Sequence, residues 1–591
     1  MPAPRRVFSA YLRLWSMANL LRISIGFNAG TGLVGSTLDM NALTLVTLPF
    51  LIALAGFMPS SYAGTLPFVA MLARALTNLA KGSMMSNSQM WATQMDFAVM
   101  IALFSHVLSR RSFWLKPLSV EEERTVVSSA SKTIRWQLCI FYFASGWWKM
   151  NSSWMNPDYS CGSLFTVQPL EYLPDEVIFA PEGSIFATII PAMARSIALS
   201  GPVFTLILEA VVPVLHAVNP RQFPKLSLFG VAMTLVFHAV IALTPPPSNV
   251  STYGVTTCTR LFFMMPDAVT AAMDELLEFK RKGAILGGTM IAAAAAALAL
   301  VAPLHSIAVS TVQGEGTDWH CGYYMALTVL FVRAMYLEWF NLGVPPKTEG
   351  LKEAPASSRQ IGLSLFYAFA LPVLGLQEKA GCLMFSQLRL HGGSNHFLMP
   401  TSLLQRALID ASPANAFAGG VVRVEATTLD WVGNTFAEHM GNRTQRLVRD
   451  VAKVPGQYVW AAKSTSQRRD VPPPRFLRHT LSNLGLRKLL HTASMQRDDF
   501  WLRFTRLDGA VGDETWRTSS EGIEYMVKGK DGKIHCTRLG EFGIRHECDE
   551  REKALLAEPD SWSSALAYFL IPQPNPIVPG YTEEMHCVTW G

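Results

Sequence analysis

The chain has 591 residues and a formal net charge of +6, with 50% hydrophobic and only 16% charged residues. Soluble domains average about 25% charged residues, so this composition excludes a wholly water-soluble protein and indicates a lipid environment. The charge is unevenly spread. Long uncharged stretches fill the first two-thirds of the chain, whereas residues from 441 onward resemble a soluble protein.

Residues 1–14 form a basic N-terminal flank that contains arginines and no acidic residue. Under the positive-inside tendency such a flank is cytoplasmic. A cleaved targeting peptide or an organellar presequence is the alternative. No small-residue cleavage site ends a compact apolar region here, so we favour the flank.

Several windows approach the roughly 20 apolar residues that a membrane-spanning helix needs. Eight are clear: Asn41–Pro59, Ala92–Leu108, Thr133–Trp148, Pro202–Val218, Leu226–Thr244, Ala284–Ala302, Tyr323–Trp339 and Ile361–Leu376. Three are weaker: Leu20–Leu38, Tyr62–Leu79 and Ile185–Ser200. The sequence therefore predicts a transmembrane domain over residues 15–380, an α-helical multipass membrane bundle of about 8–11 transmembrane helices.

Residues 381–470 are expected to form a basic juxtamembrane or linker region. Residues 441–497 hold twelve Lys and Arg against two acids. Such a segment contacts anionic headgroups, contacts nucleic acid, or is a solvated basic face. Because no aromatic interleaving or nucleic-acid motif accompanies it, we favour a solvated basic face or a juxtamembrane anchor and predict no nucleic-acid partner.

Residues 471–591 are predicted to form a small C-terminal α+β soluble domain. The prolines of "VPPPRFLRHT" (471–480) exclude both a helix and a central strand. The segment "LGLRKLLHTAS" then has the pattern of an amphipathic helix. Alternation in "FWLRFTRLDGAVG" and "IEYMVKGKDGKIHCTRL", with Asp-Gly pairs, predicts β-hairpins.

Four ionisable residues interrupt the apolar windows: Asp96, Lys149, Glu209 and His238. A charge at mid-helix costs about 2.5–3.5 kcal/mol on insertion scales. Three have a plain structural explanation. Lys149 can extend to the headgroups, Glu209 can stay neutral or hydrogen-bond to a neighbouring helix, and His238 can form an interhelical hydrogen bond. Together the four residues favour a polar cavity inside the bundle, in which a desolvated Lys149 can act as a base.

The stretch "FYFASGWWKMNSSWMNPDYSCG" (141–162) resembles the signature of the HTTM domain, the membrane domain shared with vitamin K-dependent gamma-carboxylase. "LLRISIGFNAGTG" (20–32), "LILEAVVPVL" (206–215), "VFHAVIAL" (236–243) and "TRLFFMMPDAV" (259–269) are similar to further family segments, in order. The resemblance covers roughly residues 15–270. It implies an HTTM-like transmembrane domain.

The resemblance implies that Lys149 is the base that deprotonates reduced vitamin K or another quinol. It adds Glu209 and His238 as catalytic candidates. It also implies a glutamate-containing protein substrate and residence in the endoplasmic reticulum or another internal membrane. We further expect Trp148, Trp154, Asn87 and Ser88 to line the cavity.

The carboxylase has a histidine where this chain has Ser88, so epoxidation without efficient carboxylation is expected. The enzyme hypothesis is accordingly a quinol-dependent carboxylase or epoxidase-type enzyme. Its rival is a non-catalytic lipid- or quinone-binding membrane protein. A transporter ranks last, because the sequence has no internal repeat or paired broken helices.

Three cysteines follow a histidine directly or nearly so: Cys536, Cys548 and Cys587. A zinc site is conceivable, but no C-x-x-C spacing supports one, so we predict no metal and favour a disulfide if the domain is lumenal. Asn-x-Ser/Thr sequons occur at Asn151, Asn249 and Asn442. Only Asn442 lies away from membrane windows, so it is the expected glycosylation site.

Overall fold

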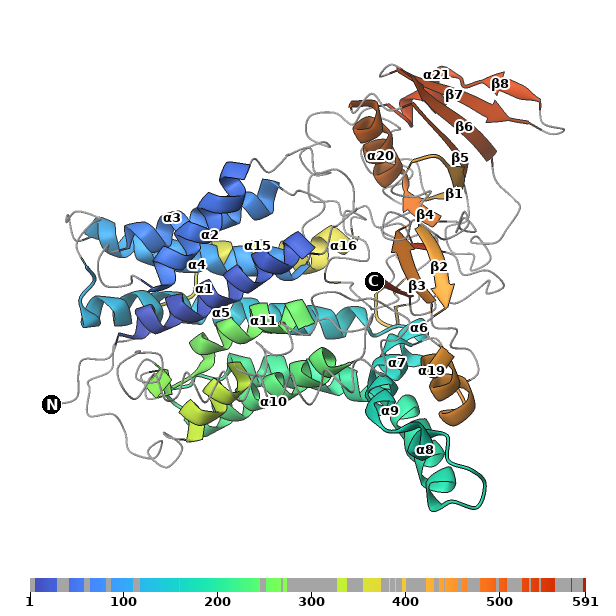
Figure 1. The fold of residues 1–591 in the computed structure, drawn as a ribbon. Coiled ribbons are helices and arrows are strands. Elements are labelled where there is room, and N and C mark those ends of the chain that lie inside the picture. Colours follow the sequence, from blue (N-terminus) through green and yellow to red (C-terminus); the bar gives the residue numbers. More distant parts are fainter. Residues whose placement is uncertain are drawn as a thin grey trace.

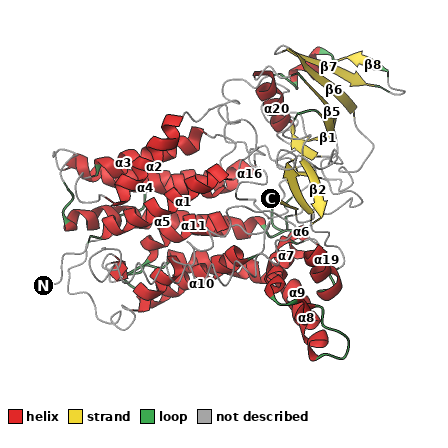
Figure 2. Ribbon diagram, viewed as in Figure 1, coloured by secondary structure: helices red, strands yellow, loops and turns green. Residues whose placement is uncertain are grey.

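The structure is a computed structural model of the chain. It describes residues 6–28, 42–57, 64–80, 87–109, 117–158, 160–244, 251–266, 269–270, 272–273, 327–336, 354–373, 382, 388, 396–399, 421–429, 435–439, 442–454, 460–464, 479–495, 499–506, 523–530, 533–540, 544–557, 575–576 and 588–590. A bundle of helices carries two β-sheets beyond one of its ends (Figures 1 and 2).

Helices α1 to α5 pack side by side in the bundle (Figure 1). Their bounds are Val7–Asn28 (α1), Ala42–Phe57 (α2), Thr65–Ala80 (α3), Asn87–Ser109 (α4) and Val120–Trp148 (α5). α5 begins with a capping box, in which the side chains of Ser119 and Glu122 each accept the other's backbone N–H. Arg6 pairs with the buried Glu123 at 3.4 Å. α1 and α5 therefore begin at the same end of the bundle, remote from the sheets.

Four short helices lead from α5 to the longest helix. They are α6 (Ser152–Met155), α7 (Cys161–Val167), the 3₁₀ helix η2 (Gln168–Tyr172) and α8 (Asp175–Ile178). α7 packs tightly on α9 (Ile185–Ala217). A Cβ added at Gly201 would lie 2.6 Å from the carbonyl oxygen of Gly162. Only a residue without a side chain allows this approach.

α9 is one helix of 33 residues, although the sequence predicts two windows there. Pro202 separates the windows in sequence but does not end the helix in the structure. α10 (Pro224–Leu243) returns along α9, and α11 (Ser251–Arg260) with the 3₁₀ turn η3 (Leu261–Met264) follows. The outer faces of α9 and α10 are apolar, so these helices present hydrophobic side chains to the surroundings.

Within the described residues, three helices are long and apolar enough to cross a membrane: Ser88–Leu108, Ile185–Ala217 and Pro224–Ile241. Shorter apolar helices cover Thr47–Gly56, Thr65–Leu79 and Leu327–Tyr336. The predicted span 284–302 lies outside the described residues. The mostly helical architecture with a small C-terminal sheet is as predicted.

A π-helical turn interrupts the helix predicted near Ile361. The segment runs as α15 (Ser358–Leu365), the π-helix η4 (Phe366–Ala370) and α16 (Leu371–Val373). The indole N–H of Trp148 donates to the carbonyl oxygen of Ala368 at 2.9 Å. A π-turn disturbs the i→i−4 ladder, and this bond satisfies a carbonyl within it. The end of α5 is thereby fixed to this helix.

The C-terminal region forms two sheets. The larger is antiparallel, in the order β8-β7-β6-β5-β1-β4-β9, and the smaller has the order β10-β3-β2 with β10 parallel to β3. The strand bounds are Val421–Thr427 (β1), Thr435–His439 (β2), Trp460–Ser464 (β3), His479–Ser482 (β4), Phe500–Arg506 (β5), Ile523–Lys530 (β6), Lys533–Leu539 (β7), Arg545–Glu547 (β8), Asn575–Pro576 (β9) and Val588–Trp590 (β10).

The predicted amphipathic helix is confirmed as α20 (Asn483–Met495), whose Leu486 and Leu490 join the apolar core of the larger sheet. One of the two predicted Asp-Gly hairpins is also confirmed, since Lys530 pairs with Lys533 in the β6–β7 register. The Asp-Gly pair at 508–509 lies outside the described residues. The larger sheet nevertheless includes β1. The sheet domain therefore draws a strand from residues 381–470, which the sequence indicates as a linker.

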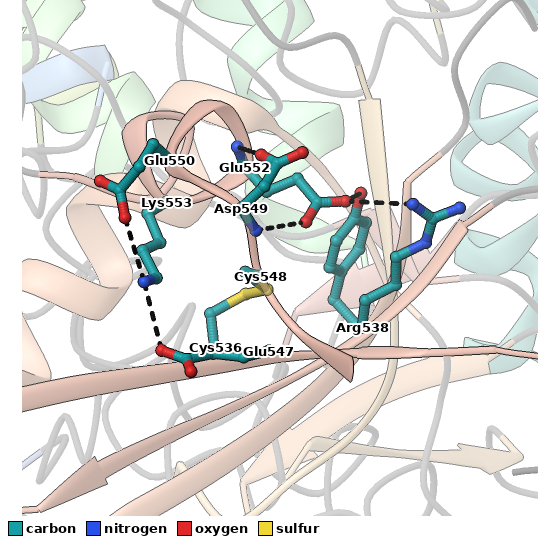
Figure 3. The surroundings of a disulfide bond; sticks show 9 residues. Cys536, Arg538, Glu547, Cys548, Asp549, Glu550, Glu552 and Lys553 are labelled. Atoms are coloured by element: carbon teal, nitrogen blue, oxygen red, sulfur yellow. Dashed lines mark hydrogen bonds and ion pairs between the residues drawn. A yellow bond between two sulfur atoms is a disulfide. The ribbon is translucent and has the colours of Figure 1, made fainter. Parts of the chain in front are cut away.

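A disulfide closes one edge of this domain (Figure 3). It joins Cys536 on β7 to Cys548, directly before α21 (Glu550–Ala554), with the Cα atoms 5.5 Å apart. Lys553 on α21 contacts Glu547 and Glu550 at 3.2 Å each. The expected disulfide among these cysteines is thus confirmed, and Cys161 is also disulfide-bonded. Disulfides persist in oxidising compartments.

A second, smaller core joins the C-terminal region to the end of the bundle. α19 (Asn442–Arg446) and the π-helix η5 (Leu447–Val451) pack against η2, α7 and α9. Arg443 donates to the carbonyl oxygen of Leu173 at 2.6 Å and pairs with Asp175 at 2.8 Å. Thr444, the last residue of the Asn442 sequon, is buried in this contact.

Glu171 makes this contact sensitive to pH. Burial raises the pKa of Glu171 from 4.5 to about 7, against the opposing effects of Thr444 and Arg443. Because the folded state binds the proton more tightly than the unfolded chain, this stabilisation is complete below about pH 4.5 and is lost as the pH rises through about 7. Its size is on the order of 3 kcal/mol.

Replacing Glu171 with glutamine should therefore remove this part of the pH dependence. Unfolding free energies of the full-length protein at about pH 5 and about pH 8 give the measurement. The wild type should lose more stability between the two than Glu171→Gln does. Glu176→Gln, a change at an exposed position close by, is the matched control. An equal loss in wild type and Glu171→Gln would contradict the assignment.

Candidate functional site: a cavity with a buried ion pair

A cavity of about 540 Å³ lies between α5, α7, α9 and α10. Its lining is mostly apolar, with a few polar side chains. The lining residues are Phe141, Tyr142, Ser145, Lys149, Trp154, Gly162, Phe165, Thr166, Phe204, Thr205, Leu208, Glu209, Phe229, Ala232, Met233, Val236, Phe237, His238, Val240, Ile241 and Thr244. The volume falls in the range typical of small-molecule sites, about 300–1,000 Å³.

The cavity is elongated along α10. Lining positions on this helix recur every three or four residues from Phe229 to Thr244, which is one helical face. At 1.5 Å per residue, this face is about 22 Å long. Phe204 is 56% exposed and Val236 is 65% exposed, so the cavity opens sideways on the apolar outer surface of α9 and α10.

One end of the cavity holds an ion pair. The Nζ atom of Lys149 lies 2.5 Å from Oε1 of Glu209, and both side chains are less than 10% exposed. Lys149 caps the C-terminus of α5, where a positive charge is favourable. Its ammonium group also lies 5.2 Å from the ring centre of Trp154, a cation–π distance.

Gly146 allows the two helices to form this pair. A Cβ added at Gly146 would lie 3.1 Å from Cβ of Glu209, which is tighter than usual contact. α5 and α9 therefore approach closely at the level of the carboxylate. A side chain at position 146 would push Glu209 away from the turn that carries Lys149.

The second carboxylate oxygen of Glu209 has no partner among the described residues. Its Oε2 atom is buried and makes no hydrogen bond with the described residues. An unsatisfied buried acceptor typically costs about 1–3 kcal/mol. Native proteins rarely keep such groups without a reason.

A second polar pair lies on the cavity wall. The hydroxyl of Tyr142 lies 2.6 Å from Nε2 of His238, and His216 Nε2 lies 3.1 Å from the hydroxyl of Thr234 behind it. The rings of Tyr142 and His216 are 5.6 Å apart. Tyr142 is thus between two histidines on α9 and α10.

The structure brings together four of the predicted site residues. Lys149, Glu209, His238 and Trp154 all line the one cavity. Their catalytic or binding roles stay predictions. Among the described residues, no group of three His, Cys, Asp or Glu is placed to hold a metal ion.

Two predicted lining residues, Trp148 and Ser88, lie elsewhere. Trp148 is fully buried, but it packs against η4 and donates to Ala368. Consecutive residues of a helix point in directions about 100° apart, so Trp148 and Lys149 contact different neighbours. Asn87 begins α4 and Ser88 follows it, buried. No described side chain of α4 lines the cavity, so Ser88 does not stand beside the ion pair.

His396 is a residue that the sequence analysis missed. Its Nε2 atom lies 2.8 Å from the carbonyl oxygen of Trp147, and its Nδ1 accepts from the N–H groups of Leu398 and Met399. Burial lowers the pKa of His396, which agrees with a neutral ring that donates at Nε2. No sequence motif distinguishes it, because its partners are backbone groups.

His396 also fixes the chain that follows Lys149. The N–H of Phe397 donates to the carbonyl oxygen of Met150 at 2.9 Å, and His396 forms a bridge with Asn151. Asn151 is fully buried as the N-cap of α6. The segment that contains His396 therefore holds the turn at the polar end of the cavity.

The fold and the site thus define a helical protein with an apolar cavity, an ion pair at the cavity's end and a C-terminal antiparallel-sheet domain. Residues 394–565 match a family described as a domain of unknown function (DUF8388). This match includes His396 and β1 to β8. No curated protein and no solved structure matches the chain.

The resemblance to the HTTM family is wrong, because the family match is to DUF8388 and no HTTM match is found. The quoted motifs consist mainly of aromatic, small and single basic residues at helix ends. Membrane proteins of many families carry such residues at the lipid–water interface. Five short motifs of this kind can follow one another in order without common ancestry.

Proposed function

We propose that the protein is a multipass membrane protein that binds a lipid-soluble molecule, a lipid or a quinone, in the cavity between α5, α9 and α10. One observation carries the proposal: an apolar cavity about 22 Å long opens sideways on an apolar surface and ends at a buried ion pair. The three long apolar helices and the hydrophobic outer faces of α9 and α10 support placement in a bilayer.

The ion pair supports binding more than base catalysis. A salt bridge requires the protonated amine of Lys149, whereas a general base must be unprotonated. The chain has no match to the HTTM family, so nothing further supports turnover of reduced vitamin K or another quinol. The same holds for a glutamate-containing substrate. The Cys536–Cys548 disulfide supports an oxidising compartment for the sheet domain. Residence in the endoplasmic reticulum stays a prediction.

Photoaffinity labelling tests the binding function. A long-chain alkyl probe with a diazirine on its chain is added to the purified full-length protein, and saturable labelling is measured with and without excess unlabelled lipid. We expect the labelled residues to lie on the cavity-facing side of α10. Val236→Trp should remove most saturable labelling, because the indole fills the opening of the cavity.

Val214→Trp is the matched control. Val214 is 66% exposed on α9, about as much as Val236, but it does not line the cavity. It should leave saturable labelling unchanged. If labelling is not saturable, or falls equally in both variants, the cavity does not bind the probe and the proposal fails.

A further inference from the structure

The polar end of the cavity has a donor and an acceptor side by side. Lys149 has three ammonium hydrogens, of which one is used by Oε1 of Glu209. Oε2 of Glu209 is buried and accepts nothing from the described residues. A ligand head group that bonds to both must accept a hydrogen bond from Lys149 and donate one to Glu209. The same atom of the ligand, or two adjacent atoms, must do this.

Two threonine hydroxyls near this end act as acceptors. The hydroxyl hydrogen of Thr166 is directed to the carbonyl oxygen of Gly162, and that of Thr205 to Gly201. Their oxygen atoms retain lone pairs and have no second hydrogen to donate. Oε2 of Glu209 is therefore an acceptor that a ketone or an ether cannot satisfy, because neither has a hydrogen to donate.

The net charge of the site is zero. Lys149 and Glu209 are the charged residues of the lining, and their charges cancel. A charged head group would introduce an uncompensated charge into a buried site, which is unfavourable. The ligand head is therefore uncharged.

We infer that the ligand is an uncharged single-chain lipid with a hydroxyl head group, whose O–H donates to Oε2 of Glu209 while its oxygen accepts from Lys149. This inference rests on the proposed binding function. A hydroxyl is the smallest head that both donates and accepts. The long apolar face of α10 receives the chain, which enters through the side opening at Phe204 and Val236.

Competition against the photoreactive probe tests the head group. Hexadecanol, hexadecyl methyl ether and palmitate have similar chains but different head groups. The alcohol both donates and accepts a hydrogen bond, the ether only accepts, and palmitate carries a negative charge. Hexadecanol should compete at a concentration about tenfold lower than the ether, because the ether leaves Glu209 Oε2 unsatisfied. Palmitate should also be at least about tenfold weaker than the alcohol.

The double variant Lys149→Met/Glu209→Leu removes both polar groups and retains an apolar cavity. The alcohol and the ether should then compete equally. Equal competition in the wild type would overturn the hydroxyl assignment and leave the binding function intact, as would stronger competition by palmitate. Absence of saturable labelling would instead overturn the binding function itself.

Discussion

Replacing Lys149 with methionine should lower the free energy of unfolding by about 3–5 kcal/mol, because it leaves the Glu209 carboxylate buried without a counter-charge. The two side chains are 8% and 7% exposed, so water cannot replace the ammonium group. Chemical unfolding of the purified protein in detergent measures the change. Lys528→Met, at an exposed position on β6, should change stability by less than about 0.5 kcal/mol.

The double variant Lys149→Met/Glu209→Leu distinguishes a broken pair from a general packing defect. Apolar replacement of both partners of a buried pair is often neutral or stabilising. We therefore expect the double variant to recover most of the stability lost in Lys149→Met. A double variant less stable than the single one would show that packing around Lys149, and not the charge on Glu209, causes the loss.

Asp96→Asn should also destabilise the protein by about 3–5 kcal/mol, through loss of its ion pair with Arg260. Arg260 Nη2 lies 2.7 Å from Asp96 Oδ1, and both side chains are nearly inaccessible. Asparagine retains an oxygen for the indole N–H of Trp15, which donates to Asp96 Oδ2 at 3.1 Å. The loss therefore reports mainly the uncompensated charge on Arg260.

Asp450→Asn provides the control for this charge effect. Asp450 pairs with Arg449 at 2.8 Å, nearly the same distance, but the two side chains are 48% and 59% exposed. Exposed pairs contribute about 0–1 kcal/mol. Similar losses of unfolding free energy in Asp96→Asn and Asp450→Asn would contradict the conclusion that burial makes the Asp96 pair strongly stabilising.

These two buried pairs account for three of the four ionisable residues that interrupt the apolar windows. Sequence alone identified Asp96, Lys149 and Glu209 as costly in an apolar helix, because a charge there needs a partner. It did not identify Arg260 as the partner of Asp96, since the two are 164 residues apart and no periodicity relates them. The fourth residue, His238, pairs with Tyr142, which hydropathy treats as an ordinary aromatic residue.

The sequence by itself determined the helical character of the described residues in the first two-thirds of the chain, the α20 helix and the β6–β7 hairpin. These features depend on apolar periodicity and on local turn chemistry, which neighbouring residues specify. It also indicated that Lys149 and Glu209, as ionisable residues in apolar helices, each need a polar partner.

Only the tertiary structure decided which groups meet. It placed Trp148 against η4 and Trp154 beside Lys149, although both tryptophans lie in one short stretch, because the end of α5 turns into α6 between them. It added β1 to the larger sheet and His396 to the turn after Lys149. These contacts join segments far apart in sequence through backbone groups and close helix approach, and such contacts leave no pattern in either segment alone.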